Sequence, residues 1–275
     1  MANHFSPDKE ASDKSYSKWG GFLTNIELFD ARFFGITEDD ALMMDPSQRL
    51  LLEVTQELLD RSGYKRAELD EKKVGIFIGG GSSAYHVYYH DKITNVLRKH
   101  AVVNQIPNML AGRIADTFNF MGPACVIDTA CSSSLVSIHQ ACQSILSGES
   151  EFAVAGGVEL LISPESHINF SKASVLSDDG RCYVFDERAK GLVLGEGVGL
   201  VLLKKYEQAL QDGDNILGVI LSSGMNNDGH TPGITVPNLK AQKALIQEVL
   251  KKSGVSPDTI SYYEAHGTGT LLGDP

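Results

Sequence analysis

Val126-Ile127-Asp128-Thr129-Ala130-Cys131-Ser132-Ser133-Ser134-Leu135 is the stretch of sequence from which we infer both the fold and a candidate site. The apolar run Ala124–Ile127 predicts a short buried strand that ends just before this turn. From Leu135 onward, apolar residues recur at helical spacing, and Gly148 stands where a helix would end. These apolar positions are Leu135, Val136, Ile138, Cys142, Ile145 and Leu146. The sequence therefore predicts a strand, a turn and a helix, with Cys131 at or just before the start of the helix.

Cys131 has two interpretations at this point. Near a helix N-terminus, free backbone N–H groups and the positive end of the helix dipole favour the thiolate over the thiol. A thiolate is a strong nucleophile toward acyl groups, and other acyl-transfer enzymes place their nucleophile at a strand–turn–helix corner. The alternative is an inert buried cysteine, the usual state of a free cysteine in a globular protein. This stretch alone favours neither interpretation.

The composition is that of a globular protein with no nucleic-acid partner. The 275 residues are 42% hydrophobic and 21% charged, which excludes a disordered chain and allows one large core or two ordinary ones. The net charge of −11 argues against nucleic-acid binding, which requires a basic surface. An acidic protein partner would need a local basic cluster, which the sequence does not locate.

Cysteine usage and hydropathy bear on the compartment. The four cysteines show no C-x-x-C spacing, and a chain of this size needs no disulfides, so we expect a reduced, cytoplasmic setting. They are Cys125, Cys131, Cys142 and Cys182. The first 18 residues are polar and contain no secretory signal, and we expect them to form a disordered lead-in. The longest apolar run, residues 192–203, is broken by Glu196 and glycines, so we expect no membrane span.

Short apolar strands alternate with amphipathic helices along the chain, a pattern typical of an α/β fold. The further strands are predicted at residues 74–78, 152–155, 199–203, 216–222 and 260–264. The further helices are predicted at residues 46–61, 108–116 and 238–252. In the first of these helices Asp45 is the predicted N-cap, Pro46 the first residue, Gln48 the partner in a capping box and Gly63 the residue that ends it.

Glu264-Ala265-His266-Gly267-Thr268-Gly269-Thr270 is a second candidate site. Its histidine follows a predicted strand, and alternating glycine and threonine allow close approach to a ligand while presenting hydroxyl groups. Histidine can donate a hydrogen bond or move a proton near neutral pH. The alternative is a turn with an incidental histidine. Grouping of these residues at the carboxyl end of a strand, where ligands of α/β sheets bind, weakens that alternative.

Together the two motifs resemble the nucleophile and first-histidine motifs of β-ketoacyl synthases, specifically the ketosynthase domains of modular polyketide synthases. The resemblance extends from about Tyr16 to Pro275. Its start is most similar to bacterial systems supplied by a separate acyltransferase. Further matching segments are Trp19-Gly20-Gly21-Phe22-Leu23, Phe33-Phe34-Gly35-Ile36, Asp45-Pro46-Ser47-Gln48-Arg49, Phe185-Asp186-Glu187-Arg188-Ala189, Gly195-Glu196-Gly197-Val198-Gly199, Asn226-Asn227-Asp228-Gly229 and Gly233-Ile234-Thr235.

The resemblance implies a thiolase-like fold with α-β-α-β-α layers, normally in a homodimer. It implies that residues 19–211 are the N-terminal, nucleophile half and that residues 212–275 begin the C-terminal half. The family's first strand precedes this chain, and its second histidine and a lysine lie downstream of Pro275. We therefore expect no condensation from these residues alone, because one oxyanion donor in place of two costs roughly 10²–10³ in rate.

The resemblance also implies roles for individual residues. Cys131 would accept an acyl chain as a thioester from an acyl carrier protein, and His266 would assist decarboxylation of a malonyl-type extender. Thr268 and Thr270 would hydrogen-bond the phosphopantetheine arm that carries the substrate. No cofactor or metal is expected to bind to this chain itself. The implied partners are the acyl carrier protein and neighbouring polyketide synthase domains.

Other residue groups receive structural interpretations. Glu196 is interpreted as a buried structural carboxylate, and residues 79–83 as a tight turn lining the acyl site, because they lack the ending of a phosphate-binding loop. A metal site at His86 and His90 is disfavoured because no carboxylate or third histidine stands at ligand spacing. Three other functions remain open: a non-elongating ketosynthase that only transfers acyl chains, a catalytically silent scaffold, and a cysteine hydrolase.

Overall fold

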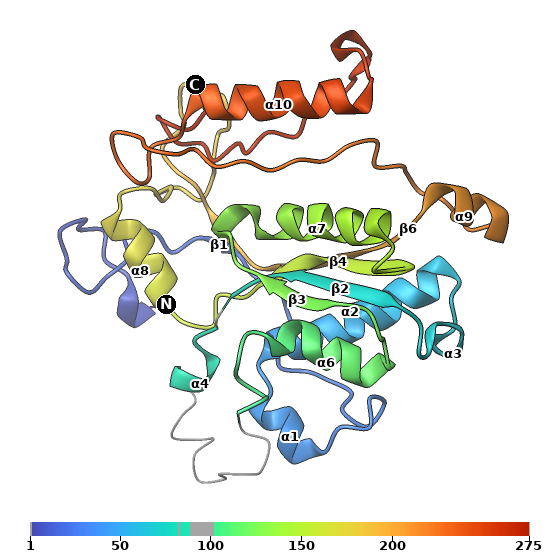
Figure 1. The fold of residues 1–275 in the computed structure, drawn as a ribbon. Coiled ribbons are helices and arrows are strands. Elements are labelled where there is room, and N and C mark those ends of the chain that lie inside the picture. The colour runs from blue at the N-terminus through green and yellow to red at the C-terminus, as the bar shows by residue number, and fades with distance from the viewer. Residues whose placement is uncertain (1, 82, 89–101, 275) are drawn as a thin grey trace. The chain divides into compact units, whose positions relative to one another are not determined.

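The computed structural model describes residues 2–81, 83–88 and 102–274, and its contacts divide the chain into two compact units (Figure 1). The sheet unit comprises residues 22–163 and 196–219, and the loop unit comprises residues 1–21, 164–195 and 220–275. Both units are assembled from segments that are distant in sequence. The boundary predicted between residues 211 and 212 does not coincide with the division into these two units. It refers to the two halves that the resemblance implies, and it remains a prediction.

A four-stranded sheet forms the centre of the sheet unit. Its strands, in hydrogen-bonded order, are β3 (Ala124–Ile127), β2 (Val74–Gly79), β4 (Phe152–Glu159) and β6 (Gly197–Lys204). β2 is parallel to β3 and to β4, whereas β6 is antiparallel to β4. The four strands predicted in this part of the sequence are confirmed, and their parallel pairs are typical of an α/β fold.

β4 is longer than predicted, because its two glycines lie inside the strand rather than at its end. Gly156 pairs with Leu200 of β6 and Gly157 pairs with Gly199. A Cβ atom on Gly156 would lie 2.0 Å from the carbonyl oxygen of Gly199. Glycine is therefore required here by the close approach of a neighbouring strand, a common reason for glycine within a sheet.

β3 is an edge strand, and the prediction that it is buried is wrong for its first half. Ala124 and Cys125 are exposed, and Val126 and Ile127 are half-buried. Within the described part of the chain, β3 pairs only with β2, so one side of its backbone has no strand partner. An apolar run cannot distinguish a central strand from an edge strand, because the distinction depends on distant segments.

Two predicted strands are absent from the described residues. Residues 216–222 and 260–264 have no strand hydrogen bonds in the structure. Their apolar, β-branched composition favours extended backbone, but a strand exists only where a neighbouring strand completes its hydrogen bonds.

Helices cover both faces of the sheet and give the sheet unit three layers (Figure 1). α7 (Ser133–Ser147) packs on β2 and β4 from one side. α2 (Pro46–Ser62) and α6 (Met109–Phe118) lie on the other side, where α2 contacts β6 and α6 contacts β2 and β3. The unit also contains α1 (Glu38–Met43), α3 (Arg66–Leu69), α4 (Tyr85–Tyr88), the 3-10 turn η3 (Ala130–Ser132) and α9 (Tyr206–Asp212).

The ends of α2 follow local sequence signals, with one exception. Asp45 caps the helix by accepting a hydrogen bond from the Ser47 N–H at 2.8 Å, and Gly63 ends it with φ of 82°. The predicted capping box is wrong. Gln48 is 1% exposed, and its amide reaches the Val103 carbonyl oxygen at 3.4 Å instead of returning to Asp45.

The main core lies between the sheet and α2 and α6. Its fully buried aliphatic and aromatic side chains include Leu51, Leu52, Leu59, Val74, Ile76, Ile78, Ile114 and Phe118. Burial of each such side chain stabilises the fold by about 1.5–3 kcal/mol, so this face of the sheet dominates the stability of the unit.

The predicted apolar face of α7 is confirmed for Ile138 and Ile145, which are half-buried and pack against the core on this side of the sheet, but its fully buried residues are small. Its buried residues are Ser133, Ser137, Ala141 and Ser144. Leu135 and Leu146 are instead 71% and 72% exposed. The buried hydroxyls bond locally; for example, Ser137 Oγ donates to the Ser133 carbonyl oxygen at 2.9 Å. Small side chains allow the helix to lie close to the sheet, which the periodicity of large residues could not indicate.

The first 18 residues are not a disordered lead-in, because residues 15–17 anchor them within the loop unit. Ser15, Tyr16 and Ser17 are buried. The Ser15 and Ser171 hydroxyls lie 2.7 Å apart, and the Tyr16 hydroxyl donates to the Leu176 carbonyl oxygen at 2.9 Å. Polar composition suggested disorder, but these hydroxyls form buried hydrogen bonds with residues about 160 positions away.

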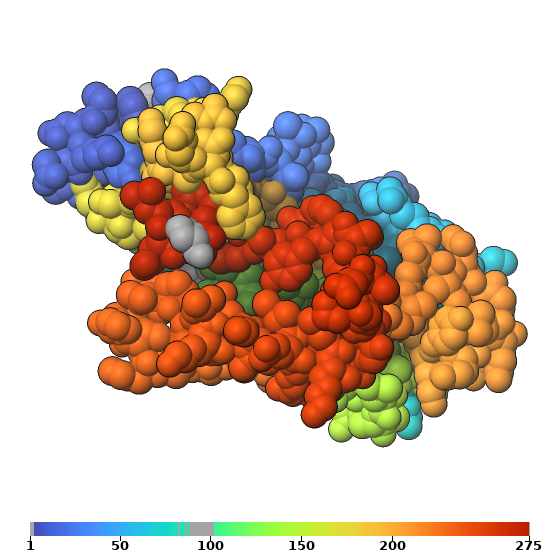
Figure 2. Space-filling model, turned by 90° about the horizontal axis from the view of Figure 1, so that it is seen from above, coloured from blue at the N-terminus to red at the C-terminus, as the bar shows by residue number. Residues whose placement is uncertain are grey.

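The loop unit contains little regular structure. β1 (Gly20–Gly21) pairs in parallel with β5 (Leu194–Gly195). The remaining elements are η1 (Ala2–His4), α8 (Glu165–Lys172), α10 (Leu239–Ser253) and η4 (Pro257–Thr259). The helix predicted at residues 238–252 is confirmed within one residue at each end, and Asn238 is its N-cap. None of the residues of α10 is buried, so the helix lies at the surface (Figure 2). Among the described residues, no helix has the length and apolar character needed to cross a bilayer.

Lys204, at the end of β6, forms a buried ionic cluster in the sheet unit. Its side chain is 8% exposed, and its ammonium donates to Tyr64 Oη and Asp214 Oδ2, each at 2.7 Å, and to Asp212. Burial opposes the charge, but hydrogen bonds with Asp212, Asp214 and Tyr64 outweigh it and raise the pKa of Lys204. The hydrogen bond from Lys204 lowers the pKa of Asp212.

We expect Lys204→Met to lower the free energy of unfolding by about 1–3 kcal/mol at pH 7, because Tyr64 and Asp214 lose a buried donor. The pKa of Asp212 is depressed in the folded state, so its contribution is present above its unfolded pKa near 4 and is lost as the pH falls through the folded value. The difference between variant and wild type should therefore shrink below about pH 4. Urea unfolding of both proteins at pH 7 and pH 3 measures this difference in the free energy of unfolding.

Lys205→Met is the matched control, because Lys205 is exposed and adjacent. An equal loss of stability in both variants would contradict a specific role for the Lys204 cluster.

Candidate active site

Cys131 lies at the corner between β3 and α7, as predicted. It is the central residue of the turn η3, and its side chain is exposed. The preceding residue, Ala130, has φ of 54°, in the left-handed region that side-chain-bearing residues rarely adopt. The alternative of a buried position for Cys131 is therefore wrong, whereas its role as a nucleophile remains a prediction. An exposed thiol on a strained turn is accessible to a reactant.

The start of α7 lies directly against the sheet, and Gly79 at the end of β2 makes this possible. A Cβ atom on Gly79 would lie 2.5 Å from the carbonyl carbon of Ser133 and 2.5 Å from the amide nitrogen of Ser134. Both atoms belong to the helix backbone, which cannot move aside as a side chain can. The first turn of α7 can therefore lie this close to the sheet only because Gly79 has no side chain.

The turn that follows β2 passes beside the same corner. The Gly80 N–H donates to the Ile127 carbonyl oxygen at 3.1 Å, and a Cβ atom on Gly81 would lie 3.1 Å from Asp128 Oδ2. These contacts agree with a tight turn next to Cys131. Ser82, which belongs to the predicted turn, lies outside the described residues, and the role of the turn in lining an acyl site remains a prediction.

Carboxylates surround this end of the sheet. Burial raises the pKa of Glu159, the last residue of β4, and the nearby charges of Asp128 and Glu196 raise it further. Glu196 accepts hydrogen bonds from the Leu161 N–H at 2.9 Å and the Leu23 N–H at 2.8 Å. Glu196 is half-buried and ties two backbone segments together, which agrees with its interpretation as a structural carboxylate.

His266, Thr268 and Thr270 lie in the loop unit. The side chain of His266 is exposed. The hydroxyl groups of Thr268 and Thr270 lie 2.9 Å apart, so the structure brings the two predicted binding residues together. Cys131 belongs to the sheet unit, and its proximity to His266 remains a prediction.

Asp274, which sequence reasoning did not identify, holds the threonine loop in place. Its Oδ1 atom accepts a hydrogen bond from the Gly269 N–H at 3.0 Å, and its Oδ2 atom accepts one from the Phe185 N–H at 2.9 Å. A Cβ atom on Gly269, where φ is 67°, would lie 2.0 Å from the Cys182 carbonyl oxygen. The loop that carries Thr268 and Thr270 is therefore fastened to residues 182–185.

The resemblance implies that Thr268 and Thr270 bind a phosphopantetheine-borne substrate, and on that expectation Asp274→Asn should raise the KM for this substrate several-fold and change kcat less. An amide offers one acceptor oxygen in place of two, so either Gly269 or Phe185 loses its partner, at a cost of about 1–3 kcal/mol. Steady-state kinetics of the full-length protein measure both constants. The matched control is Asp258→Asn, an exposed change in the same unit. A loss confined to kcat would contradict this role.

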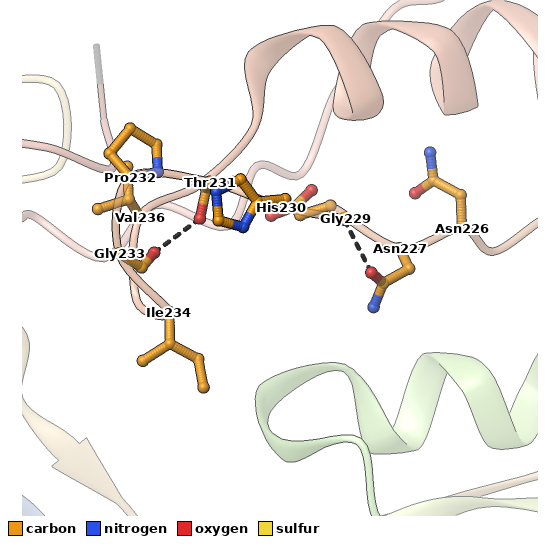
Figure 3. A pocket seen from close by; sticks show the side chains of 10 residues that line it. Asn226, Asn227, Gly229, His230, Thr231, Pro232, Gly233, Ile234 and Val236 are labelled. Atoms are coloured by element: carbon orange, nitrogen blue, oxygen red, sulfur yellow. Dashed lines mark hydrogen bonds between the residues drawn. The ribbon is translucent and has the colours of Figure 1, made fainter.

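A pocket of about 770 Å³ lies in the loop unit and is lined by residues 226–234 and Val236 (Figure 3). Its loop is held by bonds from Thr231 Oγ1 to the Gly233 carbonyl oxygen, at 2.7 Å, and from the Gly229 N–H to Asn227 Oδ1, at 2.8 Å. Amide, hydroxyl and imidazole groups could hydrogen-bond a polar ligand there. Parts of this segment belong to the family resemblance, but no sequence motif distinguished His230 as a site residue.

Metal ligands are not clustered in the part of the chain that the structure describes: no three His, Cys, Asp or Glu residues there are placed to hold an ion. Of the two histidines considered for a metal site, His90 lies outside the described residues.

Two family models match all of the chain except residues 210–216. The "Beta-ketoacyl synthase, N-terminal domain" matches residues 1–209, and the "Beta-ketoacyl synthase, C-terminal domain" matches residues 217–275. Polyketide synthase GfsA of Streptomyces halstedii is 43% identical over 272 residues, which is 98% of this chain and 4% of that protein. Polyketide synthase PksN of Bacillus subtilis is 44% identical over 269 residues, 98% of this chain and 5% of that protein.

Two solved structures are similar throughout the chain. The oxazolomycin ketosynthase domain OzmH KS7 of Streptomyces albus has a TM-score of 0.94 and 39% identity, and the match covers 100% of this chain and 49% of that chain. A ketosynthase from module 6 of the bacillaene synthase of Bacillus subtilis has a TM-score of 0.91 and 39% identity, covering 99% and 45%. The chain thus spans about half of these domains, and the predicted thiolase-like α/β fold is confirmed.

Proposed function

Because this chain belongs to the β-ketoacyl synthase family and matches the ketosynthase domains of polyketide synthases, we propose that it lengthens polyketide chains by decarboxylative condensation. Cys131 is the proposed acyl acceptor. The observation that carries this assignment is the exposed thiol at a strained strand-to-helix corner, the geometry of an activated nucleophile. Its thiolate attacks the acyl carbon of a thioester on an acyl carrier protein, and the phosphopantetheine thiol leaves.

His266 acts in the second step of the proposed reaction. A malonyl-type thioester loses carbon dioxide, and the negative charge that develops on its thioester oxygen needs hydrogen-bond donors. The imidazole of His266 can donate one such bond. The resulting carbanion attacks the acyl carbon held by Cys131, a carbon–carbon bond forms, and the Cys131 thiolate leaves.

Thr268 and Thr270 are the proposed contacts for the phosphopantetheine arm. Their hydroxyls lie 2.9 Å apart and can donate and accept hydrogen bonds with the amides of that arm. Gly269 between them lets the loop lie directly against the backbone of Cys182, which a side chain would prevent, and this contact holds the two hydroxyl groups in place.

The test uses the full-length protein with an acyl N-acetylcysteamine thioester, followed by malonyl acyl carrier protein. We expect mass spectrometry to find the acyl group on Cys131 and then a β-ketoacyl product two carbons longer. His266→Ala should keep the acyl-enzyme and slow condensation about 10²–10³-fold.

The other outcomes identify the alternatives. Acylation without elongation indicates a transferring, non-elongating ketosynthase, and absence of an adduct on folded protein indicates a silent scaffold. Steady release of the free acid indicates a cysteine hydrolase.

We also infer a homodimer that forms at the β3 edge in a cytoplasmic setting. The support is twofold. Among the residues that the structure describes, β3 has a strand partner on one side only, and Leu135 and Leu146 on the adjacent α7 are exposed apolar side chains of the kind that oligomers bury. The four free cysteines agree with a reducing compartment. Sedimentation of the full-length protein tests the dimer, and a monomer at micromolar concentration would contradict it.

A further inference from the structure

The corner that presents Cys131 depends on one unfavourable backbone conformation. Ala130 has φ of 54°, where its Cβ atom crowds the backbone. A conformation of this kind costs roughly 1–3 kcal/mol and persists only where the surrounding structure enforces it. The enforcing contacts must therefore lie next to Ala130, and they decide where the following residue, Cys131, points.

The hydroxyl group of Ser133 spans this corner from the first turn of α7. Its Oγ atom accepts a hydrogen bond from the Thr129 N–H at 2.8 Å and donates one to the Ala130 carbonyl oxygen at 2.7 Å. One atom thus bridges the peptide unit before Thr129 and the peptide unit after Ala130, and so spans both residues. The Ser133 N–H also donates to the Ala130 carbonyl oxygen, which fixes the end of the turn η3.

Three side chains form hydrogen bonds with the backbone of Thr129 and Ala130, and Ser133 is the buried one among them. It is 8% exposed, so water competes little for its two hydrogen bonds. Asp128 and Ser132 also contribute: Asp128 Oδ1 accepts from the Ala130 N–H at 3.1 Å, and Ser132 Oγ donates to the Thr129 carbonyl oxygen at 2.9 Å. Both of these side chains are exposed.

Ser133 is also held in position by the sheet. Its carbonyl carbon is one of the atoms that press against Gly79, so the first turn of α7 cannot shift toward β2. The backbone of Ser133 is therefore fixed by its contact with Gly79, and its hydroxyl group holds the strained backbone of Thr129 and Ala130.

We propose that Ser133 is a positioning residue for Cys131: through its two hydrogen bonds it keeps Ala130 left-handed and so aims the thiol at the incoming thioester. This inference rests on the proposed function of Cys131. Ser133 itself makes no contact with a reacting atom, and its effect passes through the backbone of residues 129–131.

Ser133→Ala in the full-length protein is the test, since it removes the hydroxyl and keeps the Cβ atom. We expect kcat for acyl-enzyme formation to fall about 10–100-fold with little change in KM, because misplacement by about 1 Å can cost about 10²-fold. Ser134→Ala is the matched control: it changes the neighbouring serine, whose hydroxyl does not bind the corner, and should leave kcat within about twofold of wild type.

The same Ser133→Ala change in an Ala130→Gly protein distinguishes a positioning role of Ser133 from a role in packing alone. Glycine adopts a positive φ without strain, so in an Ala130→Gly protein the Ser133→Ala change should reduce kcat only about threefold or less. Should Ser133→Ala alone fail to fold, recovery of folding in the Ala130→Gly background supports the proposal, and failure in both overturns it.

An unchanged kcat in Ser133→Ala, or equal losses in the two backgrounds or in Ser134→Ala, would overturn the inference. Absence of acylation in the wild-type protein would instead overturn the proposed function of Cys131, so the two failures are distinguishable.

Discussion

Replacement of Cys131 by alanine is expected to abolish acyl-enzyme formation, with a loss of at least about 10⁴-fold in acyl transfer. No other side chain at the corner can form a thioester, and the hydroxyl groups of Ser132 and Ser133 are engaged in hydrogen bonds that hold the turn. The measurement is intact-protein mass spectrometry of the full-length protein after incubation with an acyl N-acetylcysteamine thioester. Alanine also keeps the Cβ atom, so the backbone of the corner should remain intact.

Cys125→Ala and Cys142→Ala are the matched controls for this experiment. Cys125 is exposed on β3, and Cys142 lies on α7. These are the two elements that flank the Cys131 corner, so both cysteines are close to Cys131 in sequence. Both variants should be acylated at the wild-type rate. Persistent acylation of Cys131→Ala at another cysteine, with chain elongation retained, would contradict the assignment of the nucleophile.

Gly79→Ala is expected to cause the second-largest loss, in stability and in activity together. The new Cβ atom would lie 2.5 Å from two backbone atoms of α7, so the first turn of the helix must move away from the sheet. Overpacking of this kind costs about 1–3 kcal/mol, and displacement of the corner by about 1 Å can lower acyl transfer about 10²-fold. Urea unfolding and acylation rates of the full-length protein measure the two effects.

Gly199→Ala provides the control within the same sheet, since a Cβ atom on Gly199 of β6 would meet no atom within 4 Å. It should be acylated normally and lose little stability. Wild-type acylation by folded Gly79→Ala would show that the corner does not depend on this contact.

Local signals in the sequence predicted local structure well. The start and end of α2 follow from Asp45, Pro46 and Gly63, because caps form between residues only a few positions apart. The position of Cys131 between a strand and a helix follows for the same reason. The family motifs then located the candidate site residues without reference to the fold.

Features that depend on distant segments could not be predicted. From the sequence, Gly156 is expected to end a strand, whereas its place inside β4 depends on the pairing with β6. The edge position of β3 depends on the order of all the strands in the sheet. The fully buried residues of α7 are serine and alanine because the sheet is close; the periodicity of large residues correctly placed Ile138 and Ile145 but also included the exposed Leu135 and Leu146. Asp274 and Phe185 are 89 positions apart, so nothing local signals their hydrogen bond.

The two halves of the proposed site also differ in when they can form during synthesis. The strands and the helix that build the Cys131 corner are complete once residue 159 has left the ribosome, because β2, β3, α7 and β4 all precede it. The threonine loop forms its hydrogen bond only after Asp274 is added, which a ribosome adding about 5–20 residues per second does roughly 6–23 s later. A nascent chain could therefore carry a complete Cys131 corner well before the loop proposed to bind its substrate has formed.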